Sequence, residues 1–270
     1  MIAAMSSNYL SIDKNHTGFQ QIKDILDKKF KIIISDDAGE RITKCRNYLD
    51  KKMADSDALF YGINTGFGFL QNVQIDKAQL TELQSNLLKS HACGMGEEVP
   101  PAIVNLMLVL KLKSLSYGHS GVQLETVKRL AEMYNNEILP VVFTQGSLGA
   151  SGDLAPLSHL SLPLIGLGEV NFKGNRMPAA EVLKQLNWQP ITLQSKEGLA
   201  LINGTQFMTA YGMYNLVQAD RLMKWANIIA AISFDAFDCS LDPLNENIHR
   251  VRSHEGQVNT ASAMRALLNN

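Results

Sequence analysis

Residues 103–115 read IVNLMLVLKLKSL, a segment in which apolar side chains occupy nearly every side of a helix. Residues 205–235 add a run of about thirty residues that contains no proline. Such segments are typical of the central helices of a bundle. Two further sets of apolar residues recur at helical spacing, Leu80 with Leu83 and Leu87, and Leu124 with Val127, Leu130 and Met133. The sequence therefore predicts a mainly α fold built as a bundle of long helices.

A smaller N-terminal region is predicted to carry short strands and loops. Strand-like stretches with β-branched or aromatic residues occur at residues 30–34, 59–61 and 140–143. Glycine permits positive φ and a close approach of the backbone, so glycine-rich loops can shape a site on a helical scaffold. Three such loops lie at residues 62–68, 94–96 and 146–152. We expect a loop-bearing head over about residues 1–75 and a helical bundle over residues 76–270.

Charge and cysteine content favour a cytoplasmic protein that binds a small molecule. Lys plus Arg (25) almost balances Asp plus Glu (26), so no basic field draws the chain to nucleic acid or to an anionic membrane. Residues 225–234, the longest apolar stretch, fall short of the ~20 that cross a bilayer. Residues 1–14 lack the pattern of a secretory signal. Cys45, Cys93 and Cys239 show neither paired nor metal-site spacing, so no metal is expected.

The third glycine loop contains Ala150-Ser151-Gly152, which leads into Asp153. Asp153 can cap a helix whose first turn admits Pro156, so the tripeptide lies between a glycine turn and a helix N-terminus. A flexible turn is the plain interpretation. A phosphate-binding loop is disfavoured because the Gly-Lys-Ser/Thr ending is missing. The first loop likewise lacks the pattern of a dinucleotide site.

A compressed backbone at this point would permit ring closure. Glycine has the least hindered backbone amide of any residue type, so the nitrogen of Gly152 could reach the carbonyl carbon of Ala150. The small side chain of Ala150 allows the bend. Ser151 supplies a β-hydroxyl that can be eliminated, which leaves an exocyclic methylidene group. The carboxylate of Asp153 could assist the proton transfers of this dehydration.

Residues 146–157, GSLGASGDLAPL, resemble the signature of the aromatic amino-acid ammonia-lyases. Residues 61–68, 90–94 and 197–206 are similar to the same family in the same order, so the resemblance covers the chain from about Lys31 onward. It implies that Ala150, Ser151 and Gly152 form 4-methylidene-imidazol-5-one (MIO). In that group a 5-imidazolinone crosslink joins Ala150 to Gly152, and Ser151 becomes 2,3-didehydroalanine. The resemblance implies no metal.

The resemblance also assigns roles to three other side chains. Tyr61 would be the base that takes the β-proton of the substrate, although a half-buried core tyrosine is the plain alternative. His91 would hydrogen-bond the imidazole of the substrate, whereas as a structural residue it is a cation at a helix C-terminus. Asn203 would hold the substrate near its amino group, but with Gln206 it could also form a capping box for the long helix.

The implied reaction is the elimination of ammonia from L-histidine to give urocanate, the first step of histidine degradation. A tyrosine ammonia-lyase and an aminomutase that uses the same electrophile remain alternatives. Family members are roughly twice as long, and the C-terminal half of their pattern is absent from this sequence. The full-length protein is expected to be a homotetramer with composite sites. The isolated chain of residues 1–270 is expected to have weak or no activity, and an inactive truncated fragment is a further alternative.

Overall fold

The computed structural model describes residues 9–27, 30–56, 58–252 and 254–268. The chain divides into two compact units, Met1–Gly212 and Met213–Asn270, and the division falls within the long helix α9 (Gln206–Ala236). Helices dominate the described residues, so the predicted mainly α class is confirmed. The expected head and bundle, divided near residue 75, stay a prediction.

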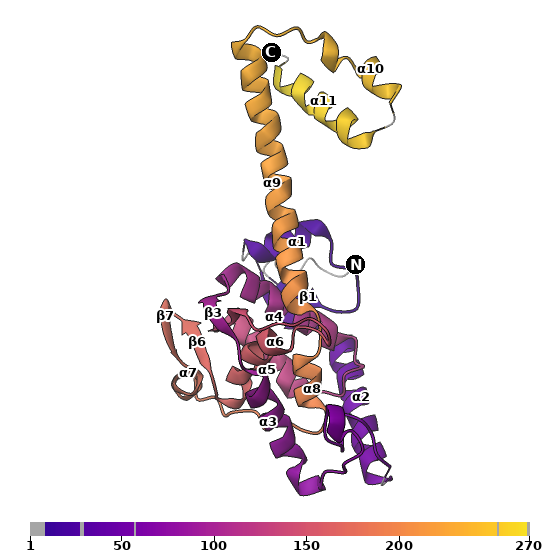
Figure 1. The fold of residues 1–270 in the computed structure, drawn as a ribbon, viewed down its shortest axis with the longest axis vertical. Coiled ribbons are helices and arrows are strands. Elements are labelled where there is room, and N and C mark those ends of the chain that lie inside the picture. Colours follow the sequence, from indigo (N-terminus) through magenta and orange to yellow (C-terminus); the bar gives the residue numbers. More distant parts are fainter. Residues whose placement is uncertain (1–8, 28–29, 57, 253, 269–270) are drawn as a thin grey trace, which may run out of the picture. The chain divides into compact units, whose positions relative to one another are not determined.

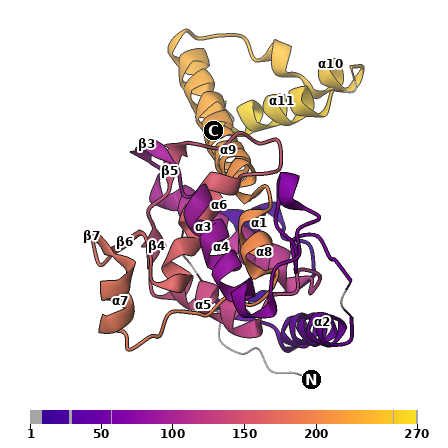
Figure 2. The same cartoon turned by 60° about the horizontal axis from the view of Figure 1, so that its bottom comes forward.

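Helix α4 (Pro101–Ser116) is the core of the first unit. Its side chains are buried on nearly every side, as the apolar segment 103–115 predicted. It contacts α1 (Phe19–Leu26), α2 (Asp36–Ala54), α5 (Leu124–Asn135) and α6 (Leu154–Ser161), which lie around it in both ribbon views (Figure 1, Figure 2). Pro101 occupies its first turn, where the missing N–H costs no hydrogen bond.

The other helices of this unit follow the predicted periodicity. Leu80 and Leu87 are buried on α3, and Val127, Leu130 and Met133 are buried on α5. The helices are α1 (Phe19–Leu26), α2 (Asp36–Ala54), α3 (Leu80–His91), α5 (Leu124–Asn135), α6 (Leu154–Ser161), α7 (Ala179–Gln185) and α8 (Glu197–Ile202). Single 3₁₀ turns are η1 (Gly68–Leu70), η2 (Lys77–Gln79) and η3 (Leu162–Ile165).

Three small sheets accompany these helices. Strands β1 (Tyr9–Ile12) and β2 (Lys31–Ile34) pair in parallel. Strands β3 (Met95–Glu98) and β5 (Phe143–Gln145) pair antiparallel, with Met95 opposite Gln145. The third sheet has the order β4 (Leu139–Pro140), β6 (Glu169–Phe172) and β7 (Asn175–Pro178), all antiparallel. The β3–β5 pair brings the segment that follows α3 beside the segment that leads into the third glycine loop.

Two of the three predicted strands differ from expectation. Residues 59–61 form no strand, because Asn64 draws this backbone into a turn: its side chain accepts from the amide of Phe60 and donates to the carbonyl of Ala58. Residues 140–143 are shared between two sheets. Val141 donates to Glu169 and Val142 accepts from Val99, so the segment passes from β4 to β5. The strand predicted at 30–34 is confirmed as β2.

The second unit contains most of α9, then η4 (Asp242–Leu244), α10 (Glu246–Arg250) and α11 (Glu255–Leu268). Helix α9 confirms the long helix predicted from residues 205–235. Unlike α4, it exposes many apolar side chains, namely Leu216, Leu222, Met223, Trp225, Ile229 and Ile232. In this chain α9 is therefore not a buried central helix.

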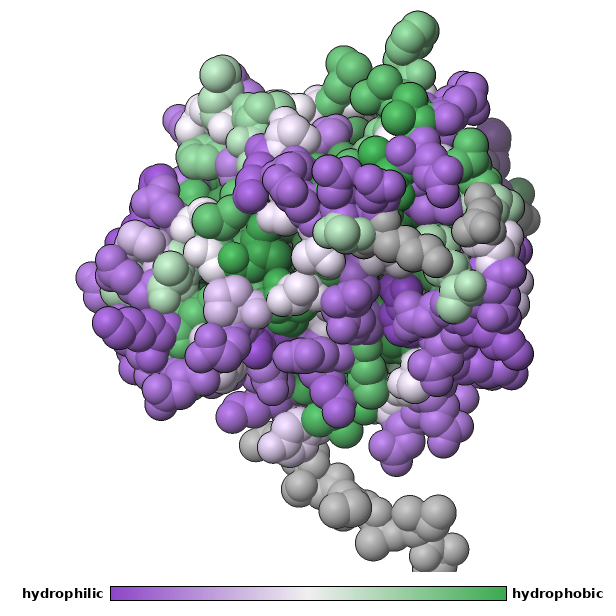
Figure 3. Space-filling view, turned by 90° about the horizontal axis from the view of Figure 1, so that it is seen from below, coloured by the Kyte–Doolittle hydropathy of each residue, from purple (hydrophilic) through white to green (hydrophobic). Residues whose placement is uncertain are grey.

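Hydrophilic side chains make up most of the face seen in Figure 3, and hydrophobic ones are visible between them and at its upper edge. None of the helices built from the described residues is both long enough and apolar enough to cross a bilayer.

Candidate active site

The tripeptide Ala150-Ser151-Gly152 lies in a loop that folds back on itself. The amide of Gly152 donates to the carbonyl of Gly149 (3.4 Å), and isolated bridges link Gly152 to both Gly149 and Ala150. Gly152 has φ +98°, and a Cβ added to it would lie 2.5 Å from the carbonyl oxygen of Gly204. Only glycine fits there, so the residue whose nitrogen was predicted to close the ring lies where the backbone is confined.

The side chain of Asp153 links this loop to the start of helix α9. Its side chain is buried and accepts from the Ser147 hydroxyl (3.1 Å) and from the Met208 amide (3.0 Å). Its own amide donates to the carbonyl of Gly204 (2.7 Å). The predicted cap is therefore wrong in its target: Asp153 occupies the N-cap position of α6, but its carboxylate binds an amide in the first turn of α9. A carboxylate is favoured at a helix N-terminus because the helix dipole is positive there.

Lys111 is a polar residue of this region that the sequence interpretation missed. It interrupts the apolar run of α4 and is 1% exposed. Its ammonium donates to the carbonyl of Ala200 (3.3 Å) in the last turn of α8. Burial lowers the pKa of Lys111 to about 7, against the opposing effect of the Asp153 charge. The sequence did contain a signal for this residue, because Lys111 is a charged residue within a segment predicted to be buried on nearly every side.

His91 and the tripeptide line one pocket. Helix α3 ends at His91, as predicted, and the β3–β5 pair then places residues 91–94 against the tripeptide loop. The pocket has a volume of about 190 Å³ and is lined by Ser90, His91, Cys93, Gly146, Leu148, Gly149, Ala150, Ser151, Gly152, Leu154 and Ala155. The structure therefore brings together two of the predicted elements of the site, which are 59 residues apart in the sequence (150 − 91).

The hydrogen-bond partners of His91 indicate which tautomer its neutral ring adopts. Its Nδ1 lies 2.9 Å from the carbonyl oxygen of Leu87. Since a carbonyl can only accept, Nδ1 carries the hydrogen, and in the neutral ring Nε2 is then an acceptor. His91 thus offers the pocket a nitrogen suited to a ligand that donates an N–H or O–H.

His159 holds the wall of this pocket. Its Nε2 accepts from the amide of Gly94 (3.0 Å), and its ring packs edge-on against Phe143 (5.1 Å between centroids). A Cβ added at Gly94 would come within 3.0 Å of the His159 ring, and one added at Gly146 within 3.0 Å of the Gly94 Cα. Burial lowers the pKa of His159, which favours the neutral ring that accepts this hydrogen bond.

Tyr61 lies on a different loop and does not line the pocket. Its side chain is 56% exposed, its hydroxyl accepts from the amide of Gly68 (3.4 Å), and its ring packs edge-on against Phe67. Its role as a base stays a prediction, as do the roles of His91, Asp153 and the tripeptide. The plain alternative, a half-buried core tyrosine, is not what the structure shows.

Asn203 is exposed and does not line the pocket either. The predicted capping box is wrong, because Asn203 is the C-cap of α8 and its amide donates to Leu199 (2.9 Å). Helix α8 is held by the buried carboxylate of Glu197, which accepts from Gln123, Thr126 and the amide of Gln194. Asn203 is therefore presented at the end of a firmly fixed helix, one residue before the Gly204 that confines Gly152.

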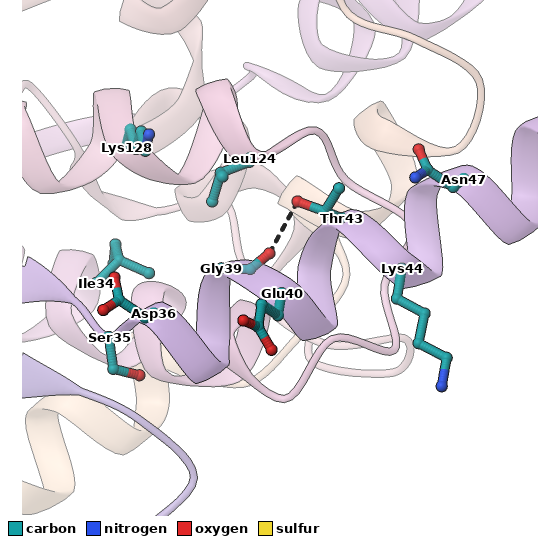
Figure 4. A pocket seen from close by; sticks show the side chains of 10 residues that line it. All are labelled: Ile34, Ser35, Asp36, Gly39, Glu40, Thr43, Lys44, Asn47, Leu124 and Lys128. Carbon is teal, nitrogen blue, oxygen red and sulfur yellow. Dashed lines mark hydrogen bonds between the residues drawn. The ribbon is translucent and has the colours of Figure 1, made fainter.

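A larger hollow of about 700 Å³ lies between α2 and α5 (Figure 4). Its lining mixes acidic and basic side chains, including Asp36, Glu40, Lys44 and Lys128, and the Thr43 hydroxyl there donates to Gly39 of the same helix. None of the residues predicted to carry chemistry lines it. The smaller pocket is the better candidate site.

Comparisons with known proteins agree with the motifs in this pocket. A family model described as aromatic amino acid lyase matches residues 18–270. Histidine ammonia-lyase of Staphylococcus aureus (strain JH9) is 44% identical over 256 residues, which are 95% of this chain and 51% of that protein. The chain thus spans about half the length of the curated relatives it matches.

Solved structures show the same fold. The crystal structure of histidine ammonia-lyase from Trypanosoma cruzi matches with a TM-score of 0.88 at 40% identity, over 96% of this chain and 51% of that one. Tyrosine aminomutase from Streptomyces globisporus matches with a TM-score of 0.90 at 34% identity, over 97% and 49% of the two chains.

Proposed function

The chain belongs to the aromatic amino acid lyase family, and from this premise we propose that the full-length protein eliminates ammonia from L-histidine to give urocanate. The observation that carries the proposal is the pocket that both His91 and the confined tripeptide Ala150-Ser151-Gly152 line. The names of the relatives at 44% and 40% identity support histidine as the substrate.

The electrophile we propose is MIO, formed by the chain itself. The Gly152 nitrogen bonds to the Ala150 carbonyl carbon, and the resulting hydroxyl leaves with the Ser151 amide hydrogen as one water. The Ser151 hydroxyl leaves with its Cα hydrogen as a second water. Atoms and electrons balance without an oxidant or a metal. The folded-back loop, the positive φ of Gly152 and the buried Asp153 beneath it fit this ring.

Once formed, the group supplies an electrophilic methylidene carbon that draws electrons from the bound substrate. The chain's own residues bind and orient that substrate. His91 Nε2 accepts a hydrogen bond from the substrate's imidazole N–H, and Asn203 contacts the amino group. Tyr61 takes the β-proton, which requires a phenolate and hence a positive environment that lowers its pKa.

An acceptor nitrogen on His91 also limits the substrate class. An imidazole N–H and a phenol O–H can each donate to it, whereas the ring of phenylalanine cannot. Tyrosine is therefore the competing substrate. A buried acceptor left without a donor costs affinity, so phenylalanine should be the poorest of the three.

An aminomutase is the second candidate function, favoured by the tyrosine aminomutase structure at a TM-score of 0.90. Such an enzyme returns the amino group to the β-carbon instead of releasing it. The two functions share the electrophile and differ in product. We further propose a homotetramer in the cytoplasm for the full-length protein, which the exposed apolar side chains of α9 and the three free cysteines support.

The test uses the full-length gene product with L-histidine, L-tyrosine and L-phenylalanine in parallel. Intact mass should fall short of the sequence mass by two waters, and Ser151→Ala should abolish this deficit. Histidine should release ammonia fastest, with urocanate absorbance rising in step. An unmodified mass would remove the electrophile, preference for tyrosine would overturn the substrate, and a β-amino acid in place of ammonia would show the aminomutase.

A further inference from the structure

Gln84 makes a buried hydrogen bond whose net contribution to stability is small. Its side chain is 0% exposed, and its Oε1 accepts from the amide of Gly198 (2.9 Å) at the start of α8. Its Nε2 has no hydrogen-bond partner among the residues that the structure describes. An apolar side chain would leave the Gly198 N–H unpaired, whereas glutamine leaves its own N–H groups unpaired. The bond therefore fixes a position more than it adds stability.

The backbones of α3 and α8 also approach closely at this bond. The two helices contact each other and lie side by side in both ribbon views (Figure 1, Figure 2). A Cβ added to Gly198 would lie 2.8 Å from the carbonyl oxygen of Gln84 and 3.0 Å from its Oε1. The preceding residue, Glu197, is held by Gln123 and Thr126 instead. The start of α8 is thus fixed from two directions, and Gln84 supplies the link to α3.

Both helices end at residues that the proposed function assigns to the substrate. His91 ends α3 seven residues after Gln84 (91 − 84), about 10 Å along the helix axis. Asn203 caps the end of α8 five residues after Gly198 (203 − 198), about 7.5 Å along its axis. Over such short distances a helix transmits a displacement with little loss. A shift at the bond between Gln84 and Gly198 therefore changes the spacing between His91 and Asn203.

The loop that carries Tyr61 packs on the same helix. Gly62 follows Tyr61, and a Cβ added to Gly62 would lie 2.5 Å from Cδ2 of Leu199. The three side chains assigned to the substrate, Tyr61, His91 and Asn203, thus stand on elements that α8 contains or contacts. The position of α8 sets their relative positions.

We propose that Gln84 is a positioning residue for the substrate: its bond to Gly198 fixes α8 relative to α3, and so sets the spacing between His91 Nε2 and the Asn203 side chain. This inference rests on the proposed function, since it concerns the binding of the same substrate. A substrate held at both points tolerates little change in this spacing, because N–H···O bonds keep to about 2.7–3.2 Å.

The test is Gln84→Met in the full-length protein, measured as kcat/KM for L-histidine. Methionine has a similar length and adapts to the same space, but it offers Gly198 only a weak acceptor. The value of kcat/KM should fall by roughly tenfold to a hundredfold, with KM raised more than kcat is lowered, because the hold on the substrate weakens in the ground state as well. The two-water deficit should remain, since Gly204 is held separately by the amide of Asp153.

Asn86→Met is the matched control on α3. Asn86 lies two residues after Gln84, but its side chain is exposed and accepts from Lys89 of the same helix. Its amide therefore links α3 to no other element through that bond. The variant should keep the kcat/KM of the wild type.

Gln84→Glu separates position from stability. Glutamate keeps the length and the acceptor for Gly198, so kcat/KM should return toward the wild-type value. It also buries a second carboxyl beside the residue that follows the buried Glu197, so its unfolding temperature should lie below that of Gln84→Met. A side chain that served only stability would rank the two variants in the same order by both measurements.

Gly198→Ala tests the same contact from α8 and carries the test if the Gln84 variants do not fold. Its Cβ would push α8 away from α3, so kcat/KM should fall as it does in Gln84→Met. Gly39→Ala is its control, because a Cβ on this α2 glycine meets Leu124 at an ordinary 3.8 Å. That variant should keep the kcat/KM of the wild type.

The outcomes distinguish this inference from its premise. A wild-type protein that retains both waters or releases no ammonia from histidine would overturn the proposed function and this role with it. An active wild type together with a folded Gln84→Met protein of unchanged kcat/KM would overturn the role of Gln84 alone. So would values of kcat/KM that follow the unfolding temperatures of the Gln84 variants. A Gln84→Met protein without the two-water deficit would also overturn it, because the defect would then lie in the electrophile.

Discussion

The loop at residues 146–153 and the loop at residues 60–76 are both rich in glycine, and they are held in different ways. The first is fixed by distant parts of the chain: Asp153 binds the amide of Met208, and Gly152 fits beneath Gly204. The second is fixed mainly by itself. Ile75 donates to Asn64, Gly66 donates to Val73, and Thr65 bridges Gln74.

The burial of the two loops differs in the same way. In the second loop Asn64 and Thr65 are buried at the base, while Tyr61 and Phe69 are exposed at the tip. In the first loop the buried group is Asp153, the residue that follows the tripeptide. We infer that the geometry of the tripeptide depends on residues 204–208 as well as on its own loop, whereas the loop of Tyr61 can be disturbed without altering the tripeptide.

The largest effect is expected from Gly152→Ala. The new Cβ would meet the Gly204 carbonyl at 2.5 Å, and φ is +98°. Strain and overpacking together should lower the free energy of unfolding by about 2–5 kcal/mol. Because Gly204 cannot move away without disturbing Asp153, the two-water deficit should also vanish. Chemical denaturation and intact mass measure the two effects.

Gly149→Ala is the control within the same loop. Gly149 also has positive φ, +81°, but a Cβ there meets nothing within 4 Å. It should cost only the backbone strain, about 1–2 kcal/mol, and leave the mass deficit in place. Equal costs for the two alanines would show that contact with Gly204 does not confine the tripeptide.

A smaller and different effect is expected from Asn64→Ala. The side chain of Asn64 is buried; it accepts from Phe60 (2.7 Å) and donates to Ala58 (2.8 Å), so its loss leaves these two partly buried backbone groups without this partner. The cost should be about 1–3 kcal/mol. The turn that presents Tyr61 should loosen, so kcat should fall while the mass deficit remains.

Asn64→Asp keeps the acceptor for Phe60 and loses the donor for Ala58, so its kcat should lie between those of Asn64→Ala and the wild type. Loss of the mass deficit in either variant would contradict the comparison, because the two loops would then depend on each other.

Local patterns predicted the parts of the molecule that local forces decide. The apolar run at 103–115 predicts α4, and the leucine spacing before His91 predicts α3, because each helix buries the face that its own sequence specifies. The glycines of residues 146–152 also marked the tripeptide loop correctly as a place of positive φ.

Long-range partners could not be predicted in this way. Nothing in the sequence around Asp153 distinguishes a side chain that caps α6 from one that accepts from the amide of Met208, 55 residues away. Lys111 finds Ala200 across 89 residues. At residues 59–61 the β-branched and aromatic pattern was overruled by the side chain of Asn64, a local competitor that hydropathy does not register.

The smallest expected effect is a pH dependence of the free energy of unfolding, which arises from the hydrogen bond between His159 and Gly94 beside the pocket. Neutral His159 accepts from Gly94, and a protonated ring cannot. Burial lowers its pKa below the usual 6.5, so in the window between the two values the unfolded chain binds a proton that the folded chain refuses. The stabilisation is complete above about pH 6.5 and is lost as the pH falls through the folded-state pKa. It should amount to less than about 1 kcal/mol, the contribution of one hydrogen bond to the free energy of unfolding.

His159→Gln, whose amide does not titrate, should lose this part of the pH dependence. His119→Gln, at an exposed position, should keep it. If denaturation curves between pH 5 and pH 7.5 shift equally for wild type and His159→Gln, the β3–β5 pair alone holds His91 against the tripeptide. The pocket wall would then be fixed by backbone pairing, and the His159 side chain would add no stability to the contact between residues 91–94 and the tripeptide loop.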